Sequence, residues 1–106
     1  MPKFMFQARY TSEGVKGLLK EGGTKRREAV EQLAKSVGGR VEAFHYALGE
    51  TDVFVIADLP DQAGAIALSN AVNASGAVTL KTIQLISPQE MDEAVRKNPQ
   101  YRPPGT

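Results

Sequence analysis

The fold is decided by residues 44–59, which read FHYALGETDVFVIADL. Both ends of this stretch are rich in aromatic and β-branched residues, and residues 49–52 contain the turn formers Gly49 and Asp52. The pattern predicts two antiparallel strands joined by a tight turn. The predicted pairs are Leu48 with Val53, Tyr46 with Val55, and Phe44 with Ala57.

Apolar residues fall on both faces of this predicted hairpin. One face holds Phe44, Tyr46, Leu48, Val53, Val55, Ala57 and Leu59, and the other holds Val41, Ala43, His45, Ala47, Phe54, Ile56 and Asp58. An antiparallel sheet with one face in water alternates apolar and polar residues, and this one does not. We therefore expect helices to cover the first face and a second subunit to cover the other. The predicted dimer interface comprises Val41, Ala43, Phe54 and Ile56.

The other helices and strands are predicted from the spacing of apolar residues and from residues that typically begin or end a helix. Residues 3–10 alternate as a strand, residues 14–19 fit a short irregular helical turn, and Thr24 is a predicted N-cap for a helix over 25–37. Pro60-Asp61 opens the next helix, with one predicted side formed by Ala63, Ile66, Ala67, Asn70, Ala71 and Ala74. Residues 77–86 predict a last strand that either contains a bulge or is buried on both faces.

The predicted fold class is α+β. The order strand, helix, strand, strand, helix, strand is typical of the ferredoxin-like βαββαβ fold, an antiparallel sheet with helices on one face. Ser87 to Glu90 fit a capping box for a short C-terminal helix that ends near Lys97. We expect one domain over residues 1–97 and a proline-rich tail over 98–106, either mobile or lying along a neighbour.

The composition of the chain argues against several classes of partner and chemistry. With 106 residues and a formal net charge of +1, the chain offers no electrostatic case for nucleic acid or membrane binding. It contains no cysteine, which excludes disulfides and thiolate chemistry. No signal-peptide pattern opens the sequence and no apolar run approaches transmembrane length, so the expected compartment is the cytoplasm.

Several segments resemble one family. Residues 10–16 (YTSEGVK) resemble its Tyr-Thr-x-x-Gly strand end, residues 38–44 (GGRVEAF) its helix-to-strand passage, and residues 49–61 (GETDVFVIADLPD) its naming motif. The chain is similar to the GYD-domain family of the dimeric α/β-barrel group, although many members have Tyr where this chain has Thr51. The resemblance implies a ferredoxin-like fold and at least a dimer. The wider group includes monooxygenases, haem-degrading enzymes, dehydratases and ligand sensors, so the resemblance implies no single activity.

The candidate catalytic residues are His45, Arg9 and Gln7. His45 is the single histidine, and its neighbours Ala43 and Ala47 are small enough to leave a hollow beside it. It is either an acid, base or haem ligand, or a histidine bonded within a core or interface. Arg9 either binds an anion with help from Gln7 or closes a strand end by pairing with Asp58.

The turn and the helix starts hold the remaining candidates. Asp52 is expected to accept backbone N–H bonds in the turn and Gly49 to supply a positive φ. Tyr10, Tyr46 and Thr51 are candidate ligand-binding residues. The cations at residues 25–27 either bind an anion at a helix start or form a solvated patch balanced by Glu28 and Glu31.

These residues leave three functional hypotheses. One is a regulatory anion or amino-acid sensor, whose site is the region of residues 25–27 or a groove between subunits. The first of the other two is a homo-oligomeric module, at least a dimer, that binds a small ligand or partner. The second is a small cofactor-independent or haem-linked enzyme that uses the sheet–helix cleft around His45. A single histidine without a carboxylate cluster provides too few ligands for a metal site, and no cofactor motif is present.

Overall fold

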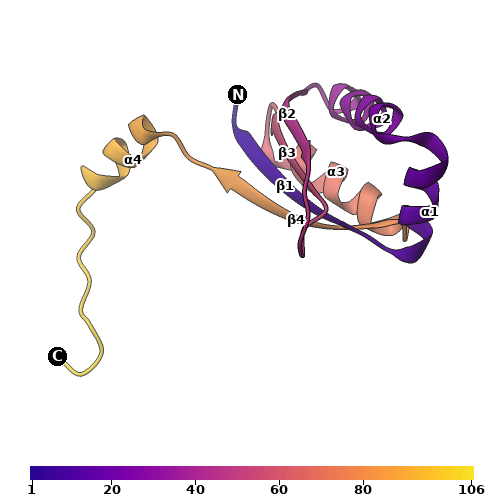
Figure 1. Ribbon diagram of the computed structural model, residues 1–106. Coiled ribbons are helices and arrows are strands. Elements are labelled where there is room, and N and C mark those ends of the chain that lie inside the picture. Colours follow the sequence, from indigo (N-terminus) through magenta and orange to yellow (C-terminus); the bar gives the residue numbers. More distant parts are fainter.

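The computed structural model describes residues 1–106, and its elements follow the predicted order. They are β1 (Lys3–Tyr10), α1 (Ser12–Glu21), α2 (Gly23–Ser36), β2 (Arg40–Tyr46), β3 (Val53–Asp58), α3 (Gln62–Ala74), β4 (Val78–Leu85) and α4 (Pro88–Val95), as Figure 1 shows. The strands form one sheet in the order β2-β3-β1-β4, with every neighbouring pair antiparallel. This confirms the α+β ferredoxin-like fold.

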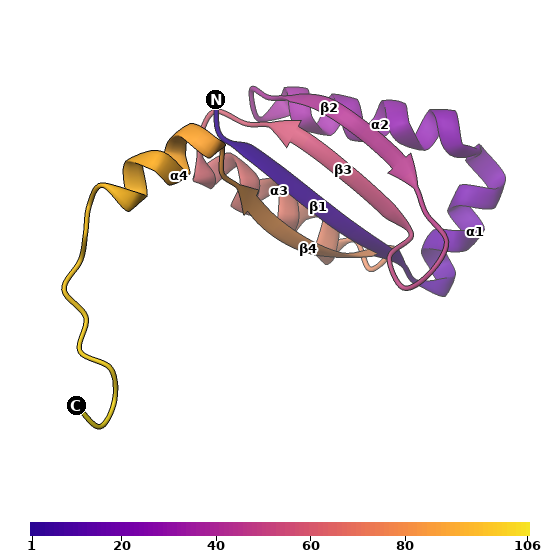
Figure 2. The same ribbon diagram turned by 60° about the vertical axis from the view of Figure 1, so that its left-hand side comes forward.

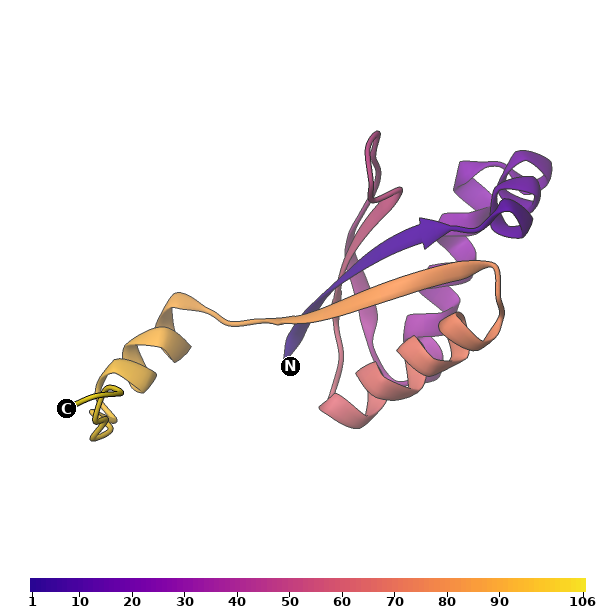
Figure 3. The same ribbon diagram turned by 90° about the horizontal axis from the view of Figure 1, so that it is seen from below.

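The helices α2 and α3 lie on the same side of the sheet. α2 packs against β2 and α3 against β4, and Figures 2 and 3 show the opposite side of the sheet without a helix. We term this uncovered side the open face. None of the helices is both long and apolar enough to cross a membrane.

The core lies between the sheet and the helices because alternate residues of the central strands point to that side. The buried cluster comprises Phe4, Phe6 and Ala8 of β1, Val53, Val55 and Ala57 of β3, Leu59, and Ala65 and Leu68 of α3. The side of α3 that was expected to approach the sheet, which includes Ala63 and Ile66, points away from it. Ile66 is 60% exposed, and α3 instead turns its larger residues Leu68 and Val72 toward the core.

The hairpin register differs from the prediction by two residues. Tyr46 pairs with Val53 and Phe44 with Val55, because the Ala47 N–H donates to the Asp52 carbonyl oxygen at 2.8 Å and leaves a loop beyond this pair. Leu48 lies in that loop and is fully exposed. A shift of two residues keeps the parity of each side chain, so Phe44 and Tyr46 still lie on the helix-covered face.

A β-bulge between Val41 and Ala43 changes the face of one predicted interface residue. Val41 pairs with Ala57 and Ala43 with Ile56, so an extra residue, Glu42, lies between them. Val41 therefore packs against the core on the helix-covered face, which corrects its assignment to the open face. Ala43, Phe54 and Ile56 keep their predicted parity.

Strand β4 contains no bulge. Its pairing with β1 is continuous from Tyr10–Val78 to Lys3–Leu85. Its apolar residues change face along the strand, because Val78 and Leu80 pack against the core whereas Ile83 is 42% exposed on the open face.

The helix starts agree with the sequence in part. Thr11 caps α1, a full helix where a short turn was expected, and accepts from the Gly14 N–H. The expected Thr24 cap is wrong: Gly22 is the N-cap residue of α2 and provides no side-chain cap. Ser87 and Glu90 form the predicted capping box of α4, with Pro88 in the first turn.

The C-terminal helix extends away from the domain. Figures 1 and 3 show α4 and the segment that follows it projecting from the end of β4, and α4 contains no buried residue. We term residues 87–106 the C-terminal arm. Met91, Val95 and Tyr101 of the arm are exposed by 48%, 71% and 76%.

Candidate functional site

The open face carries apolar residues in its middle and polar residues at its ends. Across β2, β3, β1 and β4, one row is Ala43, Ile56, Met5 and Ile83, and the next is His45, Phe54, Gln7 and Lys81. Directly opposed residues of antiparallel strands share a face, so these side chains form one surface.

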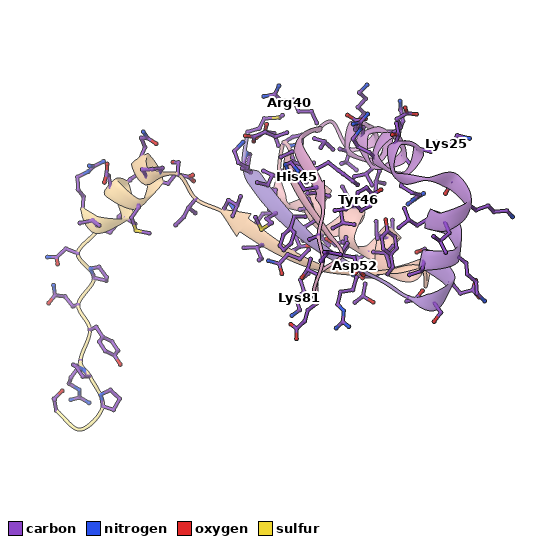
Figure 4. The ribbon with its side chains drawn as sticks, in the orientation of Figure 1. Lys25, Arg40, His45, Tyr46, Asp52 and Lys81 are labelled. Atoms are coloured by element: carbon purple, nitrogen blue, oxygen red, sulfur yellow. The ribbon has the colours of Figure 1, made fainter.

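His45 lies on this open face and is exposed. It pairs with Phe54, and Figure 4 labels it beside Tyr46, the next residue, whose side chain lies on the other face. His45 therefore does not line the space between the sheet and the helices. The sheet–helix cleft around His45 that the enzyme hypothesis requires is absent.

Arg9 and Gln7 lie on the open face but do not approach Asp58. Arg9 pairs with Thr79, whereas Asp58 pairs with Lys3 at the opposite end of β1. The expected Arg9–Asp58 ion pair is therefore wrong. Arg9 instead lines a polar hollow of about 80 Å³ whose walls are Gln7, Arg9, Glu50, Thr51, Thr79 and Lys81.

An ion cluster that sequence reasoning missed closes the other end of the open face. Asp58 is 7% exposed and accepts from Lys3 Nζ at 2.9 Å and from Arg40 Nε at 3.3 Å, while Lys3 also binds Glu42. The hydrogen bond from Lys3 lowers the pKa of Asp58, and the hydrogen bonds to Glu42 and Asp58 raise the pKa of Lys3. The cluster fixes charge of both signs at this end of the sheet.

The hairpin loop is tied to β1 by Asp52. Its Oδ2 accepts from the Tyr10 N–H at 2.8 Å, and its own N–H donates to the Ala8 carbonyl oxygen at 2.8 Å. The carboxylate thus accepts a backbone N–H, although from the neighbouring strand and not from within the turn. Gly49 has a φ of 121°, which a residue with a Cβ rarely adopts.

The strongest candidate binding site is a cavity of about 70 Å³ between the sheet and the helices. Its lining is apolar except for Arg26 of α2, and includes Tyr10, Phe44 and Val55 from the sheet. A cleft of about 380 Å³ adjoins it beside α1, since Tyr10, Arg26, Val72 and Val78 line both. The remaining charged residues of the cleft are Glu13 and Glu21.

The structure separates the cations that the sequence groups together. Arg26 Nη1 lies 3.5 Å from Glu21 Oε1, whereas Arg27 Nε lies 3.8 Å from Glu31 Oε1 on the outer surface and Lys25 forms no ion pair. The balancing carboxylates are therefore Glu21 and Glu31, not Glu28. Helical periodicity could have separated Arg26 from Arg27, because consecutive residues of a helix point about 100° apart.

Tyr46 joins β2 to the start of α2 at the rim of this region. Its hydroxyl donates to the Gly23 carbonyl oxygen at 2.9 Å, and its ring stacks edge-on against Phe44 with centroids 5.2 Å apart. Burial raises the pKa of the Tyr46 phenol, and the nearby Tyr10 raises it further. Both tyrosines thus lie on the helix-covered side, apart from His45, Arg9 and Gln7.

The structure contains no cluster of metal ligands, since no group of three or more His, Cys, Asp or Glu side chains lies close enough to hold a metal ion.

In comparisons with known proteins, the family model of the GYD domain matches residues 4–95. The comparisons with curated proteins and with solved structures found no match.

Proposed function

This chain belongs to the GYD domain family, and we propose that it is a homo-oligomeric module, at least a dimer, that binds a small ligand between its sheet and its helices. The observation that supports ligand binding is the apolar cavity with a single charged lining residue, Arg26. Such a combination of apolar walls and few polar groups is typical of small-molecule sites.

The open face supports the oligomer half. Its middle row presents Ala43, Ile56, Met5 and Ile83 without a covering helix. A twofold dimer would place this apolar row against its own copy, because the same patch occurs on both subunits of such an interface. The exposed side chains of Lys3 and Arg40, which pair with the buried Asp58 at one end, would then lie at the rim, where water can solvate them.

The C-terminal arm contributes to the same interface in this proposal. A sheet face of this size measures roughly 500 Å² in projection, from about 4.8 Å between strands and about 3.4 Å per residue. A standard interface buries about 800 Å² per partner. The exposed apolar residues Met91 and Val95 of the arm would supply part of the difference by lying on the partner.

The oligomer is tested by a matched pair of lysine substitutions. Ile56→Lys places a charge in the middle row of the open face and should reduce the mass measured by sedimentation at micromolar concentration, because an unpaired charge at a contact is costly. Ile66→Lys makes the same chemical change on the outer side of α3 and should leave the mass unchanged. A wild-type chain that sediments as a monomer would contradict the oligomer half.

The ligand half is tested by a thermal-shift screen of small molecules against the full chain. A compound that occupies the cavity should raise Tm in proportion to the logarithm of its concentration above Kd. Ala34→Leu should abolish that shift because Ala34 is buried against the cavity and the larger side chain would fill it. A screen in which no compound shifts Tm, or in which Ala34→Leu changes no shift, would contradict the proposed site.

A further inference from the structure

We infer that the ligand is an amino acid with a short aliphatic side chain, which would occupy the cavity and the adjoining cleft together. This rests on the proposed function and assigns the chemical class of its ligand. The cavity would take the side chain, and the charged residues of the cleft would take the ammonium and carboxylate groups.

The size of the cavity sets the size of the apolar group. It measures about 70 Å³. A cavity of about 150 Å³ holds benzene in another protein, so this one fits a smaller group, such as a branched chain of three or four carbons. The walls that would contact it include Val30, Phe44, Val55 and Leu80, which offer no hydrogen bond to a polar group.

The charged residues of the cleft select a zwitterion. Arg26 lines both spaces and lies where the cavity meets the cleft, while Glu13 and Glu21 line the cleft alone. An aliphatic amine would place its cation beside Arg26, and an aliphatic carboxylate would place its anion beside Glu13 and Glu21. A molecule with both charges can pair its carboxylate with Arg26 and its ammonium with the glutamates.

The contact between Arg26 and Glu21 leaves room for this exchange. Their nitrogen and oxygen atoms are 3.5 Å apart, longer than a charge-assisted hydrogen bond of about 2.7–2.9 Å. Side chains of both residues are partly exposed, at 31% and 46%. A ligand carboxylate can therefore approach Arg26 and leave Glu21 free for the ligand ammonium.

The backbone holds these groups around one cleft. Gly22, with a φ of 86°, ends α1 by donating its N–H to the Leu18 carbonyl oxygen at 2.7 Å and begins α2. Gly14 packs so closely on the backbone of Ala77 that a Cβ there would collide with the Ala77 carbonyl oxygen. These contacts bring Glu13 and Glu21 of α1 to the same opening as Arg26 of α2.

The test is calorimetric titration of the full-length chain with L-valine, L-isoleucine and L-leucine. Comparison ligands are 3-methylbutanoate, which lacks the ammonium, isobutylamine, which lacks the carboxylate, and glycine, which lacks the aliphatic group. We expect at least one of the three amino acids to bind about tenfold more tightly than every comparison ligand, because each comparison removes one of the proposed contacts.

The matched variants are Arg26→Gln and Arg27→Gln. Both remove one positive charge from the first turns of α2, but only Arg26 lines the cavity, whereas Arg27 faces Glu31. Arg26→Gln should raise Kd about tenfold or more and Arg27→Gln should leave it unchanged. If Arg26→Gln does not fold, as judged by circular dichroism, Glu13→Gln provides the second variant and should weaken the amino acid more than 3-methylbutanoate.

The outcomes separate this inference from the proposed function. An equal loss of affinity in both arginine variants, or binding of 3-methylbutanoate as tight as that of the amino acids, overturns the inference that the ligand is a zwitterion. If no aliphatic amino acid binds but another compound gives a thermal shift that Ala34→Leu abolishes, the amino-acid inference fails and the proposed ligand site stands. If nothing binds, both fail.

Discussion

The hydroxyl of Tyr46 donates a hydrogen bond of 2.9 Å to the backbone carbonyl oxygen of Gly23. These residues are distant in the sequence, and their contact joins the end of β2 to the first turn of α2. Gly23 suits this contact because a Cβ at its position would lie only 3.0 Å from the Tyr46 ring. The placement of α2, and with it Arg26, therefore depends in part on this phenol.

Tyr46→Phe should lower the free energy of unfolding by about 0.5 kcal/mol, the low end for a hydrogen bond because the side chain is 42% exposed. Urea denaturation at pH 7 measures it. Tyr101→Phe is the control, since Tyr101 lies in the arm and its hydroxyl forms no hydrogen bond within the chain. Equal effects of the two substitutions would show that the contact with Gly23 contributes nothing.

Asp58→Asn should remove part of the acid sensitivity of the fold. The pKa of Asp58 is lowered from 3.8 by Lys3, so its carboxylate stabilises the folded chain above the unfolded pKa, and this contribution is lost as pH falls through the lower folded pKa. The pKa of Lys3 is raised, so its contribution is present below 10.5 and is lost only as pH rises through the folded value.

The measurement for Asp58 is the urea midpoint of wild type and Asp58→Asn between pH 7 and pH 3. The variant should be less stable at pH 7, and the difference should shrink as the pH falls below about 4. Asp92→Asn, at an exposed position of α4 without an ion pair, should show no such convergence. A difference that stays constant with pH would contradict the role assigned to the Asp58 carboxylate.

Because the β-bulge at Glu42 places Val41 on the helix-covered face, we expect a substitution of Val41 to affect stability and not self-association. Val41→Ala should lower the free energy of unfolding by about 1 kcal/mol, because it removes methyl groups that pack partly buried against the core. The mass measured by sedimentation should not change, since Val41 lies away from the open face. A fall in mass without a loss of stability would mean that Val41 is an interface residue after all.

Alternation was enough to predict which residues of the hairpin share a face. A slip of two residues in register leaves parity unchanged, so Phe44 and Tyr46 were placed on the helix-covered side although their partners were wrong. The bulge was not predictable from residues 41–43, which alternate regularly. Contacts with residues distant in the sequence precede it: Gly39 packs against the backbone of Asp58 and Leu59, and Arg40 pairs with Asp58.

The candidate site was much less predictable than the fold. His45, Arg9 and Gln7 were selected as polar residues within strands, but strand parity places them on the face opposite the cavity. The cavity and its cleft combine Tyr10 of β1, Arg26 of α2 and Val72 of α3, which no local pattern connects. Only the packing of the helices on the sheet brings these residues together.

The C-terminal arm should strengthen the oligomer without stabilising its own domain. Helix α4 has eight residues and no buried side chain, and isolated helices of this length are marginal in water. Deletion of residues 87–106 should therefore weaken self-association about tenfold or more in a sedimentation series, as expected when apolar contacts such as Met91 and Val95 are lost.

To test whether the arm stabilises its own domain, the deletion is repeated in a chain whose self-association is already disrupted. In the Ile56→Lys chain the same deletion should leave the urea midpoint unchanged, because the arm projects away from its own domain, as Figure 2 shows. Met91→Ser should reproduce part of the weakened association, whereas Gln89→Ser, at an exposed polar position of α4, should not. Association as tight after deletion of the arm as before would exclude the arm from the interface, and a lower midpoint in the Ile56→Lys background would mean that the arm folds against its own domain.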